Sequence, residues 1–274
     1  MRFSLFCFLV FACLFSACFE PKEGCLDIAA VNFDANADKN CCCTYPNLKF
    51  VVDQRYDTLP FRRDSVFPGQ GGRPFRLHDV AFYLSEFQLL KAGAVFSVSD
   101  TQGLRVFQVN GNDTLRQVFQ NDFQLVRLET QEYTIGRFRE DGSFSGAKIR
   151  LGLSTDANRV IAPLAPASHP LSVQTDSLWQ GKSKGFVYLK VVVSRDTLST
   201  SARDTLYFTR ADVGDFLIEA KNTALLHPTG YDFRVRLTAD YQKLLGNVDW
   251  TSGSPSTWKN QIVANLPTVF SISQ

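Results

Sequence analysis

The sequence has almost no methionine, little histidine and, after its first 43 residues, no cysteine. Of the 274 residues, one is Met, the initiator, and three are His. A single Met excludes a Met-rich copper site, and three imidazoles leave few ways to build a hydrolytic centre. The G-x-S-x-G, H-E-x-x-H and phosphate-binding glycine-loop motifs are also absent. These absences predict a protein that is not an enzyme. The alternative is a hydrolase whose carboxylates are distant in the sequence and meet only in the fold.

The chain also lacks a strong charge of either sign and a long apolar run. Its net charge is +2 and no basic stripe is present, which argues against nucleic-acid binding. Charged residues make up 20% and hydrophobic residues 45%, as in ordinary globular proteins. After the amino-terminal segment no 18 consecutive residues are apolar, so the sequence predicts no spanning helix there.

The amino-terminal segment has the layout of a secretion signal. A basic head, Met1-Arg2, precedes an apolar run, Phe3–Phe15, interrupted by one serine. This run is shorter than the roughly 20 apolar residues that a membrane-spanning helix needs. Residues 1–17 are therefore predicted to be a signal peptide that is removed.

The end of this signal resembles a lipobox, at which a peptidase cuts before a lipid-bearing cysteine. Small residues stand directly before the cysteine in Ser16-Ala17-Cys18. We predict a bacterial lipoprotein that carries its lipid on Cys18. It would be anchored in the outer membrane, at the periplasmic face or at the cell surface. The alternative is an ordinary signal peptide cut near Ala17, with Cys18 left free.

A cysteine-rich spacer, residues 18–46, follows the signal. It contains Cys25 and the triplet Cys41-Cys42-Cys43. Outside the cytoplasm such a cluster predicts a disulfide, and a Cys25–Cys43 bond would close a loop worth about 3 kcal/mol. A bond between Cys41 and Cys42 would be strained. A thiolate metal site formed by Cys25 and the triplet is the alternative, although no C-x-x-C pair is present.

Oxygen-bearing side chains alternate between these cysteines. Asp34, Asn36, Asp38 and Asn40 occupy every second position, as the ligands of a calcium loop do. Lys39 stands where an EF-hand has its turn glycine, and no bidentate Glu follows. Asp- and Asn-rich turns also form without a metal, so calcium and a metal-free turn both remain open.

The same segment resembles a short secreted motif of the form C-x-D-x-x-A-x-N-Y/F-D, followed by an acidic turn and C-x-Y. The matching residues run from Cys25 through Asp34 to Tyr45. The motif occurs beside many exported domains and carries no assigned chemistry. The resemblance implies a disulfide-stapled spacer.

Strand patterns dominate from residue 47 to the carboxyl terminus. Aromatic and β-branched residues are concentrated in six segments, 48–53, 80–90, 122–128, 147–153, 185–193 and 231–237. Apolar and polar residues alternate in 123–128 and 233–237, the period of a half-buried strand. Short strands separated by turns, without alternating helices, predict an all-β antiparallel sandwich with long loops. One short C-terminal helix is also predicted, with Ser254 as N-cap, Pro255 at its first position and Pro267 as its stop.

Several motifs occur in the order found in one family of exported proteins. They are Phe82-Tyr83-Leu84-Ser85, Ile149–Ser154, His169-Pro170-Leu171, Trp179 and Gly185–Leu189. Together they resemble the methanobactin-associated periplasmic protein (MbnP-like) family over residues 47–274. The resemblance implies an exported β-rich domain. In some members it also implies copper binding, in which a partner haem enzyme oxidises a tryptophan to kynurenine.

The resemblance names candidate copper ligands. His169 matches the family's His-Pro-Leu, His78 precedes the Phe-Tyr strand, and Trp179 stands where the family has a tryptophan. Imidazoles without accompanying carboxylates suit Cu(I). Many relatives have a Trp-x-Trp pair, whereas Gln180 follows Trp179 here. The alternatives are a loop role for His169, through a hydrogen bond to the backbone, and a packing role for Trp179.

A further pattern is Asp, then Thr or Ser, then an apolar residue, which occurs six times. It resembles the acceptor triplet of a periplasmic O-glycosylation system, and glycans there would be bulky and exposed. The alternative is that Asp and Thr simply flank turns and strand starts. The six hydroxyl residues are Thr58, Ser65, Thr114, Ser177, Thr197 and Thr205.

Taken together, the sequence predicts a non-catalytic lipoprotein with a copper-associated binding domain. Expected partners are the membrane, through the lipid, and a haem-containing oxidase. The alternative is a surface structural or adhesin-like module in which the histidines bind no metal.

Overall fold

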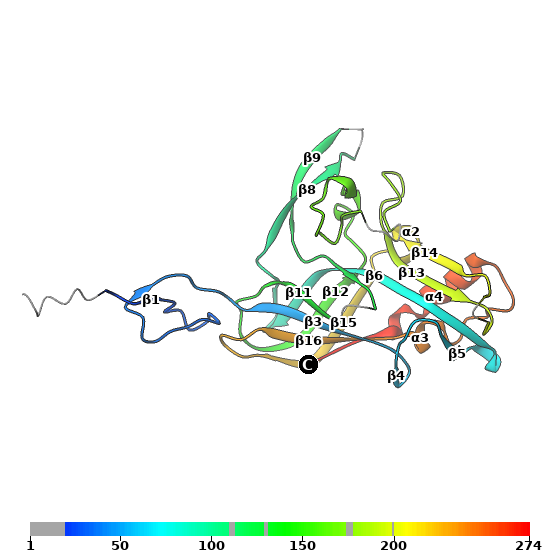
Figure 1. Ribbon diagram of the computed structural model, residues 1–274, viewed down its shortest axis with the longest axis horizontal. Coiled ribbons are helices and arrows are strands. Elements are labelled where there is room, and N and C mark those ends of the chain that lie inside the picture. Colours follow the sequence, from blue (N-terminus) through cyan, green and yellow to red (C-terminus); the bar gives the residue numbers. More distant parts are fainter. Residues whose placement is uncertain (1–19, 110–112, 129–130, 174–177, 199) are drawn as a thin grey trace, which may run out of the picture.

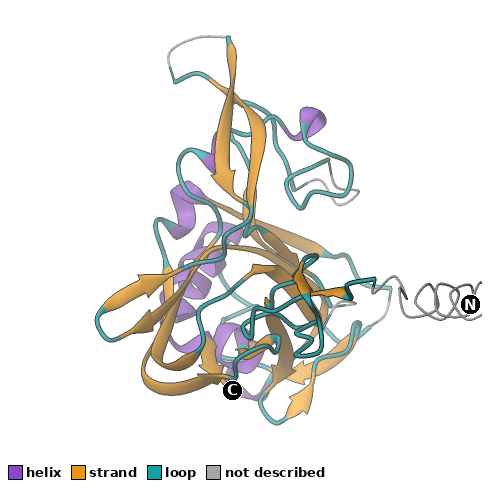
Figure 2. Ribbon diagram, turned by 90° about the vertical axis from the view of Figure 1, so that its left-hand side faces the viewer, coloured by secondary structure: helices purple, strands orange, loops and turns teal. Residues whose placement is uncertain are grey.

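A computed structural model describes residues 20–109, 113–128, 131–173, 178–198 and 200–274 (Figure 1). The predicted lipid on Cys18 and the predicted glycan on Ser177 lie outside these residues. Within them, two main β-sheets form the body of the molecule, and short helices, a hairpin and the spacer surround it (Figures 1 and 2).

The larger sheet has eight strands, and its longest, β6 (Pro74–Lys91), pairs with five of the others. The remaining strands are β5 (Ser65–Pro68), β7 (Ala94–Phe96), β10 (Gln124–Val126), β12 (Gly142–Leu151), β13 (Val187–Ser194), β14 (Asp204–Thr209) and β15 (Leu217–His227). Their main order is β14-β13-β6-β12-β15, and β5, β7 and β10 also pair with β6. All of these pairs are antiparallel.

The smaller sheet has five strands. They are β3 (Asn47–Tyr56), β4 (Leu59–Pro60), β11 (Glu132–Arg137), β16 (Phe233–Asp240) and β17 (Phe270–Ser273). The order is β11-β3-β16-β17, with β4 on β3, and only the β3–β16 pair is parallel. Along β3 every second residue is buried, so one face of this sheet packs on the core.

Aromatic side chains join the two sheets. Phe50 of β3 meets Phe87 of β6 with ring centroids 4.8 Å apart, and Phe144 of β12 meets Phe233 of β16 at 5.4 Å. Such contacts between facing sheets are the core of a sandwich. The predicted all-β sandwich is therefore confirmed.

The opposite face of β6 is covered by loops. Neighbouring residues of a strand point to opposite faces, so Phe82 reaches Phe270 of the smaller sheet while Tyr83 points away from it. The Tyr83 ring packs on Phe186, and its hydroxyl donates to the carbonyl oxygen of Pro170 at 3.1 Å. Tyr83 thereby fixes the loop that contains His169 against the larger sheet.

The C-terminal helix begins where the sequence predicts, but its predicted end is wrong. The helix α4 (Pro255–Val269) starts after Ser254, whose hydroxyl accepts a hydrogen bond from the Thr257 amide. It continues through Pro267 instead of stopping there. In the last turn a proline removes only one helical hydrogen bond, and the burial of Leu266 and Val269 keeps that turn on the core.

The other helices are short. They are the α-helices α2 (Arg210–Val213) and α3 (Tyr241–Leu245) and the 3-10 turns η1 (Gln70–Gly72), η2 (Ala157–Arg159) and η3 (Ala162–Leu164). No helix in the described ranges is long and apolar enough to span a membrane.

Two parts extend beyond the sandwich. The hairpin β8 (Thr101–Phe107) and β9 (Thr114–Gln120) stands above the sheets in Figure 1, and the spacer, with β1 (Glu23–Gly24) and β2 (Lys39–Asn40), extends to the left. Asp27 connects the spacer to the domain, because it pairs with Arg139 at 3.1 Å.

Candidate functional site

A polar cavity lies where the base of the β8–β9 hairpin, β11 and the loop 166–170 meet. Its volume is about 420 Å³, and its lining includes Asp100, Gln102, Asn121, Phe123, Thr134 and His169. All three histidines lie in the described residues, and His169 is the only one of them that lines this cavity. The cavity is therefore the place to test the predicted copper site.

His169 is held by a tight turn and by both of its ring nitrogens. The amide of Leu171 donates to Nδ1 at 3.1 Å, and Nε2 lies 3.1 Å from Oδ1 of Asn121. Because Nδ1 accepts, the hydrogen of the neutral ring is on Nε2, which donates to Asn121. The predicted loop role, a bond to the backbone, is thus present, while the other nitrogen faces a residue that lines the cavity.

Burial keeps the His169 ring neutral. It lowers the pKa of His169 to about 4, because a charged imidazole would lose its hydration. The ring also packs edge-on against Phe123, with centroids 5.7 Å apart. A neutral imidazole keeps one lone pair at neutral pH, and a lone pair is what a metal ligand needs.

His78 lies elsewhere, in a bulge of β6. Leu77 pairs with Val193 and Asp79 with Val192, so His78 is the extra residue, and a bulge of this kind re-aims a side chain. The positions of His78 and Tyr83 on the strand differ by five residues, about 16 Å. Since Tyr83 contacts the His169 loop, the structure does not bring the two histidines together.

The surroundings of His78 resemble an Asp-His-Ser triad. In a catalytic triad, however, the serine hydroxyl donates its hydrogen bond to the histidine, and here the serine accepts. Nδ1 bonds to a carboxylate oxygen of Asp64, and Nε2 lies 2.8 Å from the Ser194 hydroxyl. That hydroxyl donates to the carbonyl oxygen of Ala202 at 3.1 Å, so it accepts from the histidine. Ser194 is fully buried, whereas the Asp64 side chain is 56% exposed. A nucleophilic serine needs the opposite arrangement.

Trp179 lies on the same face of the larger sheet as the His169 loop. It forms a β-bridge with Phe186, the residue that packs on Tyr83. Its side chain packs against the core, and its buried indole N–H has no hydrogen-bond partner among the described residues. Trp179 is not part of the cavity lining. The predicted packing role of Trp179 fits this position, because the indole joins the core beside Phe186.

His227 has a structural environment. Its Nδ1 and Nε2 lie 2.5 and 2.7 Å from the carbonyl oxygens of Glu140 and Tyr231, and its ring stacks on Phe233 at 4.8 Å. Among the described residues no group of three or more His, Cys, Asp or Glu side chains could hold a metal. Among the three imidazoles, His169 is therefore the one that lines the cavity, while His78 and His227 have other surroundings.

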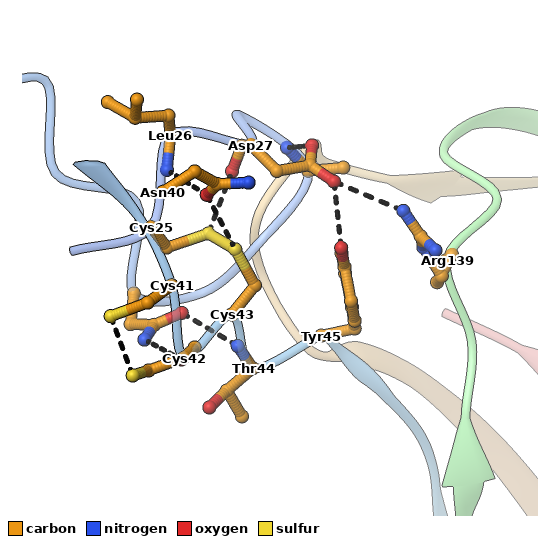
Figure 3. The surroundings of a disulfide bond; sticks show 12 residues. Cys25, Leu26, Asp27, Asn40, Cys41, Cys42, Cys43, Thr44, Tyr45 and Arg139 are labelled. Carbon is orange, nitrogen blue, oxygen red and sulfur yellow. Dashed lines mark hydrogen bonds and ion pairs between the residues drawn. A yellow bond between two sulfur atoms is a disulfide. The ribbon is translucent and has the colours of Figure 1, made fainter. Parts of the chain in front are cut away.

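In the spacer, Cys25 and Cys43 form a disulfide, as predicted (Figure 3). Cys41 and Cys42 are free thiols. The pair Cys25–Cys43 thus uses two of the four sulfurs that the alternative thiolate metal site required.

Three of the four predicted calcium ligands, Asp34, Asp38 and Asn40, have a side-chain oxygen bound by another protein group. Asp34 pairs with the Lys22 ammonium at 2.7 Å, and Asp38 accepts from the Lys22 amide at 3.0 Å. Asn40 accepts from the Leu26 amide at 2.9 Å. For Asn36 the structure shows a backbone bond, in which its amide donates to Asp34 at 2.9 Å. These contacts describe a turn held by a lysine and by backbone amides.

The predicted glycan acceptors are mostly accessible. Thr58, Thr114, Thr197 and Thr205 are exposed, and Ser65 is half-buried. Exposure is necessary for glycosylation and does not establish it, so these residues remain predictions.

Sequence reasoning missed the polar partners around the histidines. Asn121 at the cavity, Asp64 and Ser194 beside His78, and the buried Asp122 were not anticipated. Burial raises the pKa of Asp122 to about 6, against the opposing effect of bonds from the amides of Phe87 and Glu86. No local pattern marks these residues, because each meets its partner across a long stretch of chain.

The comparisons with known proteins bear on the domain. The MbnP family model matches residues 45–261. The fold is similar to that of MbnP from Methylosinus trichosporium, with a TM-score of 0.46 and 12% identity over 82% of this chain and 97% of that chain. No curated protein matches the sequence. Since the family model covers most of the chain, this protein belongs to the MbnP family.

Proposed function

We propose that this chain is a non-catalytic envelope protein whose MbnP domain binds copper with His169 as a protein ligand. One observation carries the proposal: a buried, neutral imidazole lies at the wall of a polar cavity of about 420 Å³. Imidazole nitrogen is a good ligand for copper. Bound copper supplies a one-electron redox couple or is itself the cargo.

The donor set limits how copper can bind. The cavity offers one imidazole and otherwise oxygen and amide groups, of which Asp100 already bonds to Arg137 at 2.6 Å. Binding through Nε2 of His169 requires its hydrogen to move to Nδ1, and the bond from Leu171 then breaks. One imidazole does not complete a Cu(I) set, and the cavity leaves room for ligands that arrive with the metal.

Copper titration against a competing Cu(I) chelator tests this proposal. The variant His169→Gln should bind at least about tenfold more weakly than the unchanged protein. His227→Gln is the matched control, since it removes an imidazole outside the cavity and should not change the affinity. Circular dichroism of each variant checks that it is folded. Equal affinity for His169→Gln and the unchanged protein would disprove the assignment, and binding lost only in Cys41→Ser or Cys42→Ser would move the metal to the spacer.

The absence of catalysis is supported by the environment of His78. The one Asp-His-Ser arrangement noted above has a buried serine that accepts from the histidine. Ester hydrolysis by the purified protein above the rate of the buffer, lost in Ser194→Ala, would contradict a non-catalytic role.

A lipid on Cys18 and a haem-containing oxidase partner belong to the same proposal. The Cys18→Ala variant should leave the membrane fraction or remain unprocessed, and normal processing with membrane association would contradict lipidation. Trp179 is the candidate substrate of the oxidase. A mass change on the Trp179 peptide of protein from its native host is expected if that partner acts on this chain.

A second candidate function is a surface interaction module, which the projecting β8–β9 hairpin favours. Val118 on β9 and Val109 in the turn are 67% and 77% exposed. Exposed apolar side chains on a projecting edge suit contact with another molecule. Val118→Lys should then reduce attachment of whole cells to surfaces while copper affinity stays unchanged. Attachment unchanged by Val118→Lys would disprove this second function.

A further inference from the structure

The spacer presents two thiols that touch each other. The sulfur atoms of Cys41 and Cys42 lie 2.7 Å apart, and Cys42 is exposed while Cys41 is half-buried. Figure 3 shows both side chains on one side of the segment, whereas Cys43 turns away from them to Cys25. The disulfide and the free pair are therefore separate features of the same turn.

The backbone around the free pair is held in place. The Cys41 amide donates to the carbonyl oxygen of Gly24 at 2.9 Å. The side chain of Asn32 donates to the carbonyl oxygen of Cys42 and accepts from the amide of Thr44, both at 2.8 Å. Cys42 has a φ of 58°, a left-handed conformation that residues with a side chain seldom adopt. The Asn32 amide thus stabilises the unusual backbone that sets the two sulfurs side by side.

Two sulfurs at this distance need little movement to bond. A disulfide is about 2.05 Å long, so small rotations of the two side chains would close the gap. A bond between adjacent residues is strained, and strained or exposed disulfides are the ones that are easily reduced again. The geometry of this pair is therefore that of a reversible disulfide.

We propose that Cys41 and Cys42 are a redox pair that exchanges electrons with an external disulfide. The Cys42 thiolate attacks one sulfur of that disulfide, and the other external sulfur leaves as a thiolate. The Cys41 thiolate then attacks the Cys42 sulfur of the mixed disulfide and expels the second external thiolate. The pair loses two protons and two electrons and becomes a disulfide, while the external disulfide gains them and becomes two thiols.

Accessibility and acidity give the two cysteines different roles. Cys42 is exposed, so an external disulfide can reach its sulfur. The hydrogen bond with Cys42, together with burial, raises the pKa of Cys41 to about 11. The half-buried Cys41 is therefore the less reactive of the two thiols toward an external disulfide. Cys42 is the attacking thiol, and Cys41 closes the bond.

Redox titration of the full chain tests this inference. The protein is equilibrated with glutathione and its disulfide at fixed ratios, alkylated, and mapped by mass spectrometry. In a second arm the oxidant is a C-x-x-C oxidoreductase in its disulfide form. We expect the Cys41–Cys42 peptide to lose two hydrogens reversibly in at least one arm while the Cys25–Cys43 disulfide stays intact. The arm that reacts distinguishes a small-molecule oxidant from a protein oxidant. Two separate mixed disulfides, or exchange of Cys25–Cys43 before the pair reacts, would overturn the proposal.

Single substitutions separate the roles of the two thiols. Cys41→Ser should trap glutathione on Cys42, and Cys42→Ser should react about tenfold more slowly at Cys41. Asn32→Ala should shift the redox midpoint of the pair, and Asn36→Ala, another asparagine of the spacer, is the matched control that should not. Equal trapping rates in the two cysteine variants would contradict the assigned order.

Discussion

His78 and His169 are both buried, and each uses both ring nitrogens in hydrogen bonds, but the groups around those partners differ. His78 sits in the bulge of β6 between Asp64 and Ser194, and the serine in turn bonds to the backbone. His169 bonds to the backbone on one side and to a cavity residue, Asn121, on the other. Burial and hydrogen bonding alone therefore do not identify a binding imidazole. What distinguishes His169 is the space beside its second nitrogen.

The largest expected effect is on stability when the His78 ring is removed. We expect His78→Ala to lower the free energy of unfolding by about 3 kcal/mol, since it breaks a bond to a carboxylate and leaves a void in a closed site. His169→Ala should cost only about 1 kcal/mol, because water from the cavity can reach the freed Leu171 amide. Denaturant unfolding of both variants measures the difference, and equal losses would show that the two environments are energetically alike.

The sequence could predict the strands that alternate cleanly. The segments 48–53 and 233–237 lie within β3 and β16, whose side chains face the core at every second position. The sequence-based prediction failed where the two-residue alternation of apolar and polar residues is interrupted. The strand predicted to begin at residue 80 begins at Pro74, because the bulge at His78 disrupts the alternation. The β8–β9 hairpin was missed because no residue of β9 is buried, so that strand lacks a core-facing period, although Leu104 and Val106 of β8 reach the core.

For the candidate site, the sequence could identify His169 but not its surroundings. The His-Pro-Leu motif marked the residue through the family resemblance. The cavity is formed by segments that are far apart in the chain, including Asp100, Asn121 and Thr134. Likewise, nothing local shows that Asp64 and Ser194 enclose His78, because 116 residues separate His78 from Ser194. Contacts between residues so far apart in the sequence depend on which strands pair in the sheet. The alternation of apolar and polar residues along a single strand does not specify this pairing.

The second largest effect is a pH dependence of stability that comes from His169. The folded pKa of His169, about 4, is below the ordinary value of 6.5. Its contribution to stability is therefore present above pH 6.5 and is lost as the pH falls toward 4. We expect a loss of about 2 kcal/mol over this window, a value reduced because the cavity admits solvent.

His169→Gln should flatten that pH dependence, and His227→Gln should retain it. Unfolding free energies at pH 7.5 and pH 4.5 give the measurement. If His169→Gln keeps the full loss between these two pH values, the ring is not the buried neutral group described here.

Asp122, next to Asn121, should show a smaller effect of opposite sign. Burial raises its folded pKa from the ordinary value of 3.8 to about 6, so its favourable contribution is present below about pH 4 and is lost as the pH rises through 6. Asp122→Asn keeps an oxygen acceptor for the Phe87 amide but only one of the two carboxylate oxygens. We expect a gain of about 1 kcal/mol at pH 7.5 and none at pH 4. Urea unfolding at both pH values tests this, and a loss of stability at pH 7.5 would mean that the ionised carboxylate is needed by its amide donors.

The smallest expected effect is the loss of stability in Asp64→Asn, and its size shows which interaction holds the His78 ring in place. The hydrogen bond from His78 keeps the pKa of Asp64 below its usual range, so the ionised Asp64 carboxylate contributes above about pH 4 and its contribution is lost as the pH falls through the lowered pKa. The Asp64 side chain is 56% exposed, and exposed pairs contribute little. Asp64→Asn preserves an acceptor for Nδ1 and should cost less than about 1 kcal/mol at pH 7, and the cost should shrink as the pH falls below about 4. If instead Asp64→Asn costs as much as His78→Ala, charge holds the imidazole in the bulge. With the small cost expected, shape and the buried bond to Ser194 hold it, and the contrast with His169 rests on whether the ring is enclosed or faces a cavity.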